Sequence, residues 1–267
     1  MRHFVRLAAA LLVVCLPPHS GLCQTTKPES RLLTARALYY TPTTAGLESF
    51  SCKVAVDWKG LLGDASGKEI KDDNPLLVYL NSAQLALNDT LRGNGSLEWA
   101  DTATPAESVK DPAAKMKEGL GQMLSGFFDT WNVYMNGTMV PAPDRTTTLT
   151  PENKGMHLHA EQGQSVLDED YDENMLLTHV HVVSGTIDVD AVPVFVDTPD
   201  GRIISSVQSA YRQPSTAPPV YLTMGVEYGQ VNGYHLPSKI RYQMKNVLSE
   251  MDLNLSQCTA ISKPAKQ

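Results

Sequence analysis

Two histidine pairs offer the clearest chance of chemistry in this sequence. His157 and His159 stand two residues apart in the segment GMHLHAEQG, and Glu161 follows two residues later. Residues two apart in an extended strand point to the same side, so the two imidazoles and the carboxylate would share one face. Such a set suits zinc, iron or manganese. The second pair, His179 and His181, alternates with valines in LTHVHVV and has no acid at ligand spacing.

Two interpretations of these pairs stay open. If the pairs lie on neighbouring strands, they could meet as a four-histidine cluster and serve a metal-dependent enzyme of the cell envelope, the alternative function for His157/His159 and His179/His181. The simpler interpretation is that they are polar residues on the solvent face of a half-buried sheet. We favour the simpler one, and therefore assign no metal ligand and no cofactor.

The acidic segment DEDYDEN, residues 168–174, spaces Asp168, Asp170 and Asp172 like the start of a calcium loop. An EF-hand loop would then need glycine where Glu173 stands and glutamate where His179 stands, and both fail. We expect a solvated acidic hairpin tip here. The sequence also lacks a GxSxG elbow, a phosphate-binding glycine loop and a dinucleotide fingerprint, so we assign no catalytic residue.

The start of the chain predicts export. Residues 1–23 combine a basic beginning, the apolar run LAAALLVVCL and a break at PPHSGLC. This is typical of a secretory signal peptide, and we expect cleavage before Gln24 and a periplasmic or secreted protein. Residues 24–267 then form a single domain. The formal charge of −7 argues against a nucleic-acid partner.

Only Cys52 and Cys258 remain after cleavage, and an exported protein can join them in a disulfide. Cys52 shares its strand face with apolar neighbours, whereas Cys258 shares its face with polar ones. A β-bulge or a strand end would be needed to bring the two sulfurs together.

Hydrophobic periodicity predicts a mixture of helices and strands in the first half of the chain and strands alone in the second half. We expect a short helix over residues 29–40, a strand over 50–58, a helical turn leading into a strand over 74–91, a turn at RGNG (92–95), and a returning strand at SLEWAD. From residue 145 onward the pattern has period two, with turns at Gly163, Ser184-Gly185, Pro199-Asp200-Gly201 and Asn232-Gly233. The segment RQPSTAPP (212–219) reads as the longest loop. The sum is an antiparallel meander of about nine to eleven strands.

The clearest helix runs from about Asp111, a plausible N-cap, to Asn136, and it carries one apolar stripe. The stripe has two interpretations: ordinary core packing, or one wall of a lipid-binding cavity. The candidate cavity residues are Leu120, Leu124, Phe127, Phe128 and Trp131.

The order of elements resembles that of the periplasmic lipoprotein-sorting proteins of the LolA/LolB type, mainly in the final segments VNGYHLPSKIRYQMKN and MDLNLSQC. The resemblance implies an α+β fold in which a curved antiparallel half-barrel is covered by one long helix and shorter helices. It also implies an exported, non-catalytic carrier that binds a lipid or lipoprotein acyl chain, with a transient envelope protein as a further partner. A structural envelope domain without a ligand is the remaining alternative.

Overall fold

The computed structural model describes residues 27–91, 95–135, 140, 147–152, 155–213, 216–245 and 248–263. The predicted signal peptide, residues 1–23, lies outside the described residues, as does most of the predicted RGNG turn at 92–95. Among the described residues, no helix is both long enough and apolar enough to span a bilayer.

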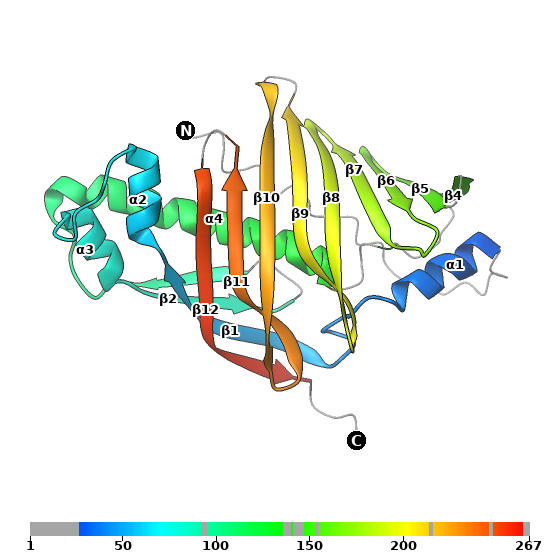
Figure 1. The fold of residues 1–267 in the computed structure, drawn as a ribbon, viewed down its shortest axis with the longest axis horizontal. Helices are drawn as coiled ribbons and strands as arrows, with labels where there is room; N and C mark the ends of the chain where they lie inside the picture. Colours follow the sequence, from blue (N-terminus) through cyan, green and yellow to red (C-terminus); the bar gives the residue numbers. More distant parts are fainter. Residues whose placement is uncertain are drawn as a thin grey trace. The chain divides into compact units, whose positions relative to one another are not determined.

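The described chain contains four α-helices, one short 3-10 helix and twelve strands (Figure 1). The helices are α1 (Lys27–Arg36), α2 (Trp58–Ser66), α3 (Pro75–Ser82), η2 (Glu107–Val109) and α4 (Lys110–Met135). The strands are β1 (Leu47–Val56), β2 (Gln84–Asp89), β3 (Ser96–Ala100), β4 (Thr147–Glu152), β5 (Gly155–Gln162), β6 (Ser165–Tyr171), β7 (Leu177–Ser184), β8 (Ile187–Thr198), β9 (Gly201–Gln213), β10 (Thr216–Val231), β11 (Tyr234–Met244) and β12 (Leu248–Ser262).

The strands form one sheet with the order β3-β2-β1-β12-β11-β10-β9-β8-β7-β6-β5-β4. The strand pairs from β4 to β9, and those joining β1, β2, β3, β11 and β12, are antiparallel. An antiparallel sheet with one long helix and several short ones is therefore confirmed, with one strand more than the sequence predicted. Closure of the sheet into a half-barrel stays a prediction.

Contacts within the chain divide it into two compact units. We call residues 42–132 and 224–263 the disulfide unit, and residues 27–41 and 133–223 the histidine unit. Strand β10 contributes residues to both units, and the one-domain prediction for residues 24–267 stays a prediction.

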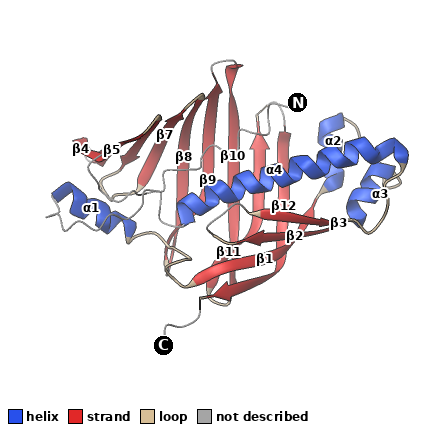
Figure 2. Cartoon of the chain, turned by 180° about the vertical axis from the view of Figure 1, so that it is seen from behind, coloured by secondary structure: helices blue, strands red, loops and turns tan. Residues whose placement is uncertain are grey.

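The core of the disulfide unit lies between α4 and the sheet (Figure 2). Phe128 and Trp131 of α4 contact the ring of Phe50 on β1, with ring centroids 5.9 Å apart in each pair. The hydroxyl of Tyr242 on β11 donates to the carbonyl of Met123, 2.7 Å away. The apolar stripe that the sequence places on this helix is thus the side that packs on β1 and β11.

Short turns with left-handed backbone fix how consecutive strands align. Gly163, Gly185 and Gly201 have φ values of 62°, 59° and 121° at three of the hairpins, and Asn232-Gly233 has 52° and 85° at a fourth. Glycine and asparagine enter this region at low cost, which is why these pairs close two-residue hairpins. All four predicted turns are confirmed.

A disulfide joins Cys52 on β1 to Cys258 on β12. Between the pairs Ser51↔Thr259 and Lys53↔Ser256, β12 holds one more residue than β1, and Gln257 there has a φ of 50°. This bulge changes which face the following residue points to. The bulge therefore brings Cys258, which the sequence places on the polar face of its strand, to Cys52 on the apolar face of β1. The sequence had left open how the two sulfurs could meet.

Two sequence predictions about local structure are wrong, and one helix was missed. Residues 212–219 are mainly strand, since β9 extends to Gln213 and β10 begins at Thr216; extended backbone accepts proline near the start of a strand. Asp111 is not the N-cap, because η2 runs directly into α4 and places Asp111 in the first turn. Helix α2 was not predicted, because its nine residues include two glycines, which have low helix propensity.

The disulfide predicts a large effect on stability. Cys52 and Cys258 are 206 residues apart in sequence, and removing a native bond typically costs roughly 2–5 kcal/mol. We expect Cys52→Ser to lower the free energy of unfolding by that amount, measured by denaturant titration. The control is the double variant Cys52→Ser/Cys258→Ser, which loses the bond without leaving a free thiol. Non-reducing peptide mapping that finds two free thiols in protein from an oxidising compartment would contradict the prediction.

Candidate functional site: a histidine–aspartate face

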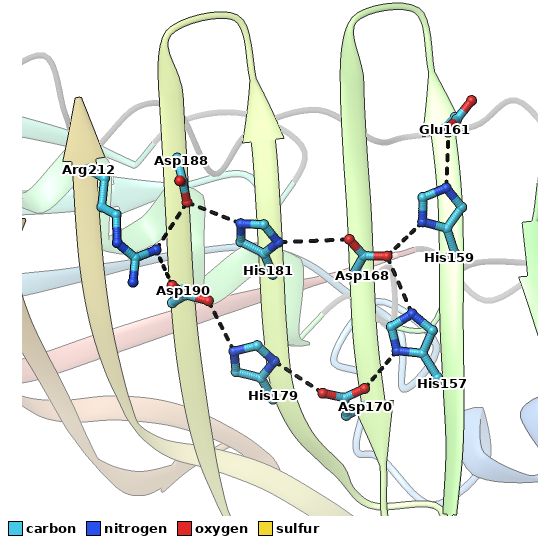
Figure 3. Close-up of polar contacts among 10 residues, drawn as sticks. All are labelled: His157, His159, Glu161, Asp168, Asp170, His179, His181, Asp188, Asp190 and Arg212. Atoms are coloured by element: carbon cyan, nitrogen blue, oxygen red, sulfur yellow. Dashed lines mark hydrogen bonds and ion pairs between the residues drawn. The ribbon is translucent and has the colours of Figure 1, made fainter. Parts of the chain in front are cut away.

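Four neighbouring strands of the histidine unit, β5 to β8, bring histidines and aspartates together on one face (Figure 3). The strand register sets His157 opposite Asp170 and His159 opposite Asp168. On the other side of β6, His179 and His181 of β7 lie opposite these same two aspartates. Histidine and aspartate therefore alternate from strand to strand across the sheet. We call the ten residues drawn in Figure 3, together with Glu152 of β4, the histidine–aspartate face.

The buried apolar side chains of these strands lie on the opposite face. Met156 and Leu158 of β5, Val180 of β7, and Val189 and Ala191 of β8 are all buried. The two-residue period of a strand separates them from the partly exposed histidines and aspartates. The buried side chains anchor the sheet, and the polar side chains are free to interact with one another.

The contacts between β5 and β6 are short. Nδ1 of His157 lies 2.7 Å from Oδ1 of Asp170, and Nδ1 of His159 lies 2.6 Å from Oδ1 of Asp168. The second nitrogens also face carboxylates: Nε2 of His157 lies 3.4 Å from Asp168, and Nε2 of His159 lies 3.3 Å from Glu161. Both nitrogens of each ring therefore have an acid nearby.

The same pattern continues from β6 to β8. Nδ1 of His179 lies 3.2 Å from Oδ2 of Asp170, and its Nε2 lies 3.2 Å from Asp190. Nε2 of His181 lies 3.1 Å from Asp188. Asp170 thus contacts one histidine from each neighbouring strand, and it uses a different carboxylate oxygen for each contact.

Arg212 on β9 closes the face at one side. Its guanidinium contacts Asp188 at 3.3 Å and also contacts Asp190. Nδ1 of His181 lies 3.8 Å from Asp168, which completes the links across all four strands.

The histidine–aspartate face holds more histidine–carboxylate contacts than the N–H groups of neutral imidazoles can serve. A neutral imidazole has one N–H, so only one of its two nitrogens can donate to an acid. Hydrogen bonding to Asp170 is the largest cause that raises the pKa of His157, and bonds to Asp168 and then Glu161 raise the pKa of His159. The face therefore favours extra positive charge, either as protons on the rings or as a bound cation.

The charge of the face points the same way. Asp168, Asp170, Asp188, Asp190, Glu161 and the nearby Glu152 give six carboxylates against the single guanidinium of Arg212. The formal charge is −5 when the four histidines are neutral. Glu169, on the buried side of β6, does not add to it, because burial raises its pKa to about 8.

One part of the face has metal-ligand geometry. Glu152 at the end of β4, His157 and Asp170 each offer one ligand atom, and these atoms lie within 4.8 Å of one another. One imidazole nitrogen and two carboxylate oxygens form a donor set that zinc and other divalent transition metals accept.

The structure corrects two interpretations of these residues. Asp168 and Asp170 are not at a hairpin tip, because they lie within β6 and only Asp172 reaches the following turn, where it accepts the N–H groups of Asn174 and Leu176. The histidine pairs do not meet as a four-histidine cluster, since β6 lies between β5 and β7. The histidines lie on the more exposed face of the sheet, as predicted. Their side chains are nevertheless only 30–37% exposed, and each of them contacts an acid.

Sequence reasoning missed four contributors to the face. Glu152, Asp188 and Asp190 were not singled out, although Asp188 and Asp190 share the two-residue spacing of the histidine pairs. Arg212 was assigned to a loop. The spacing and the turn at Gly185 were the available signals.

The proposed cavity residues of α4 lie elsewhere, in the disulfide unit. Leu120, Leu124, Phe127, Phe128 and Trp131 are each at most 3% exposed. Phe127 contacts Phe128 with ring centroids 4.8 Å apart, and the indole N–H of Trp131 donates to the hydroxyl of Tyr228 at 3.0 Å.

Comparison of the chain with protein-family models, with curated proteins and with solved structures finds no match.

The raised pKa values of His157 and His159 predict how stability depends on pH in metal-free protein. The folded state holds protons more tightly than the unfolded chain, so this stabilisation is fully present below the ordinary histidine pKa of 6.5 and is lost as pH rises through the higher folded values. With a chelator present, we expect the melting temperature to fall over that range, and to fall less in Asp170→Asn. An NMR titration that gives His157 a midpoint at or below 6.5 would contradict this.

Proposed function

We propose that the protein is an exported binding protein for a divalent transition-metal cation, held by Glu152, His157 and Asp170. The observation that carries the proposal is the convergence of three ligand atoms from three strands within 4.8 Å. Zinc is the natural probe, because it accepts mixed imidazole and carboxylate ligands and needs no redox partner.

The surroundings of His157 support a ligand role. Its Nδ1 lies 2.7 Å from Asp170, so this nitrogen and the carboxylate can both bind one cation once the nitrogen is deprotonated. Its Nε2 lies 3.4 Å from Asp168, where an N–H on that side has an acceptor. Metal-binding histidines usually donate their other ring N–H to such a carboxylate, which fixes the ring and the tautomer.

The wider face supports cation capture as well. A formal charge of −5 with neutral histidines attracts cations, and the exposed side chains leave the site open to solvent. An oxidising compartment outside the cytoplasm fits both the predicted signal peptide and the Cys52–Cys258 disulfide.

Zinc titration by isothermal calorimetry near neutral pH tests the proposal. We expect one equivalent bound by the wild type, and a loss of affinity of at least about tenfold in His157→Ala and in Asp170→Asn, since each removes a ligand. Asp168→Asn should weaken binding by roughly tenfold, because it removes only the partner of the second ring nitrogen.

Two matched variants serve as controls. His181→Ala and Glu161→Gln change the same face but leave Glu152, His157 and Asp170 intact, so both should bind zinc like the wild type. Equal affinities for the wild type and Asp170→Asn, or no stoichiometric zinc in either, would reject the proposal.

A second candidate function is carriage of an acyl chain by a half-barrel whose sheet α4 covers. It is supported by the apolar stripe of α4, whose residues are enclosed in the disulfide unit. Burial of each acyl CH₂ is worth roughly 0.8 kcal/mol, so one chain could bind with few polar contacts. The ring contacts of Phe127 and Trp131 already fill much of that interior, and a carrier would have to separate them.

Phe127→Ala distinguishes carriage from core packing. If Phe127 only fills the core, the change should cost roughly 3–5 kcal/mol of stability and leave uptake of a fluorescent fatty acid at background. If the stripe lines a ligand space, the cost should be smaller and uptake should change. Melting temperature and fatty-acid fluorescence are measured side by side, with Glu118→Gln on the exposed side of α4 as the control. A wild type that takes up no fatty acid would rule out the carrier function.

A further inference from the structure

Asp129 is a buried carboxylate without a hydrogen-bond partner. It lies on α4 in the disulfide unit, and its side chain is among those least exposed, at 3%. Neither of its oxygens is accessible or hydrogen-bonded to any part of the chain that the structure describes. A buried charge without a partner is strongly disfavoured, so its presence needs an explanation.

A second buried acid lies across from the same side of α4. Asp89, at the end of β2, is 1% exposed. It accepts the N–H of Leu91 at 2.6 Å and the side-chain amide of Asn132 at 3.2 and 3.3 Å. Asn132 and Asp129 are three residues apart in the helix, which places them on one side of it, one turn from each other.

Both acids have raised pKa values, and the charge of Asp129 acts on Asp89. Burial is the main cause that raises the pKa of Asp89 to about 6, and the charge of Asp129 raises it further. Burial likewise raises the pKa of Asp129 to about 6. When both carboxyl groups are ionised, two negative charges share one buried region.

Protons alone would not satisfy this arrangement. A protonated carboxyl still needs an acceptor for its O–H, and neither oxygen of Asp129 has a hydrogen-bond partner among the described residues. A small cation satisfies both oxygens and neutralises the charge at the same time. The donors are carboxylate oxygens, which hard cations prefer.

We propose that Asp129 and Asp89 bind a hard cation such as Ca²⁺ between α4 and β2. The cation would complete the buried side of α4 and hold the last turns of this helix against the sheet. The site is distinct in residues and in ligand chemistry from the histidine–aspartate face, and the two proposals can fail independently.

Thermal unfolding with Ca²⁺ as the only added ligand tests the proposal. In chelator-treated protein at neutral pH, Ca²⁺ should raise the melting temperature of the wild type by roughly 5 °C at concentrations far above the dissociation constant. Asp129→Asn should abolish the rise. Without Ca²⁺ it should melt no lower than the wild type, because the amide has nearly the same shape and removes a buried charge.

Two controls locate the effect. Asp170→Asn on the histidine–aspartate face and Glu118→Gln on the exposed side of α4 should keep the full Ca²⁺ response. The response should also disappear in Asp89→Asn; because Asp89 also bonds the backbone of Leu91, this variant is interpreted only beside Asp129→Asn.

Two results would overturn the proposal. One is an equal Ca²⁺ response in the wild type and in Asp129→Asn. The other is no Ca²⁺ response at neutral pH, together with a wild-type melting temperature that rises as pH falls through about 6; protons rather than a cation would then neutralise Asp89 and Asp129.

Discussion

The register of β5, β6, β7 and β8 is the constraint on which the histidine–aspartate face depends. A slip of one residue would turn His157 and His159 inward and expose Met156 and Leu158, because side chains alternate with a period of two. Partly exposed ion pairs are worth at most about 1 kcal/mol each, too little to enforce the register alone. The buried apolar residues and the left-handed turn glycines set it, and the polar contacts follow from that alignment.

The same two features explain how much of the fold the sequence predicts. Helix α4 and the hairpins at Gly163, Gly185 and Asn232-Gly233 follow from periodicity and turn chemistry, which are local. The segment at 212–219 was misjudged because prolines suggested a loop, whereas proline only prevents a strand residue from donating in the ladder. The Cys52–Cys258 pairing shows the opposite limit: parity in a single strand cannot reveal a bulge at Gln257, because the extra residue is visible only against the partner strand.

The sequence predicted only part of the histidine–aspartate face. The histidine pairs stood out by spacing, but the acidic run was assigned to a turn on its composition. If the hairpin between β5 and β6 is centred at Gly163-Gln164, Asp168 lies opposite His159 and Asp170 lies opposite His157, as in the structure. Glu152 could not be found in this way, because its position beside His157 depends on the pairing of β4 with β5, and residues 153–154 carry no strong turn signal in the sequence.

The two carboxylate groups of this protein differ in what surrounds them, and this difference separates the cations they suit. Asp168 and Asp170 are partly exposed and have imidazoles on both sides, so their charge can be compensated by protons, and a metal that binds there must displace protons from ring nitrogens. Asp129 is buried and has no hydrogen-bond partner among the described residues, so a bound cation or a proton must neutralise it inside the fold. Nitrogen ligands with open access favour a borderline metal in exchange with solvent, whereas buried oxygen ligands favour a hard cation retained as part of the folded core. Solvent access and donor type, rather than the number of acids, therefore distinguish the two cation sites that we propose for this chain.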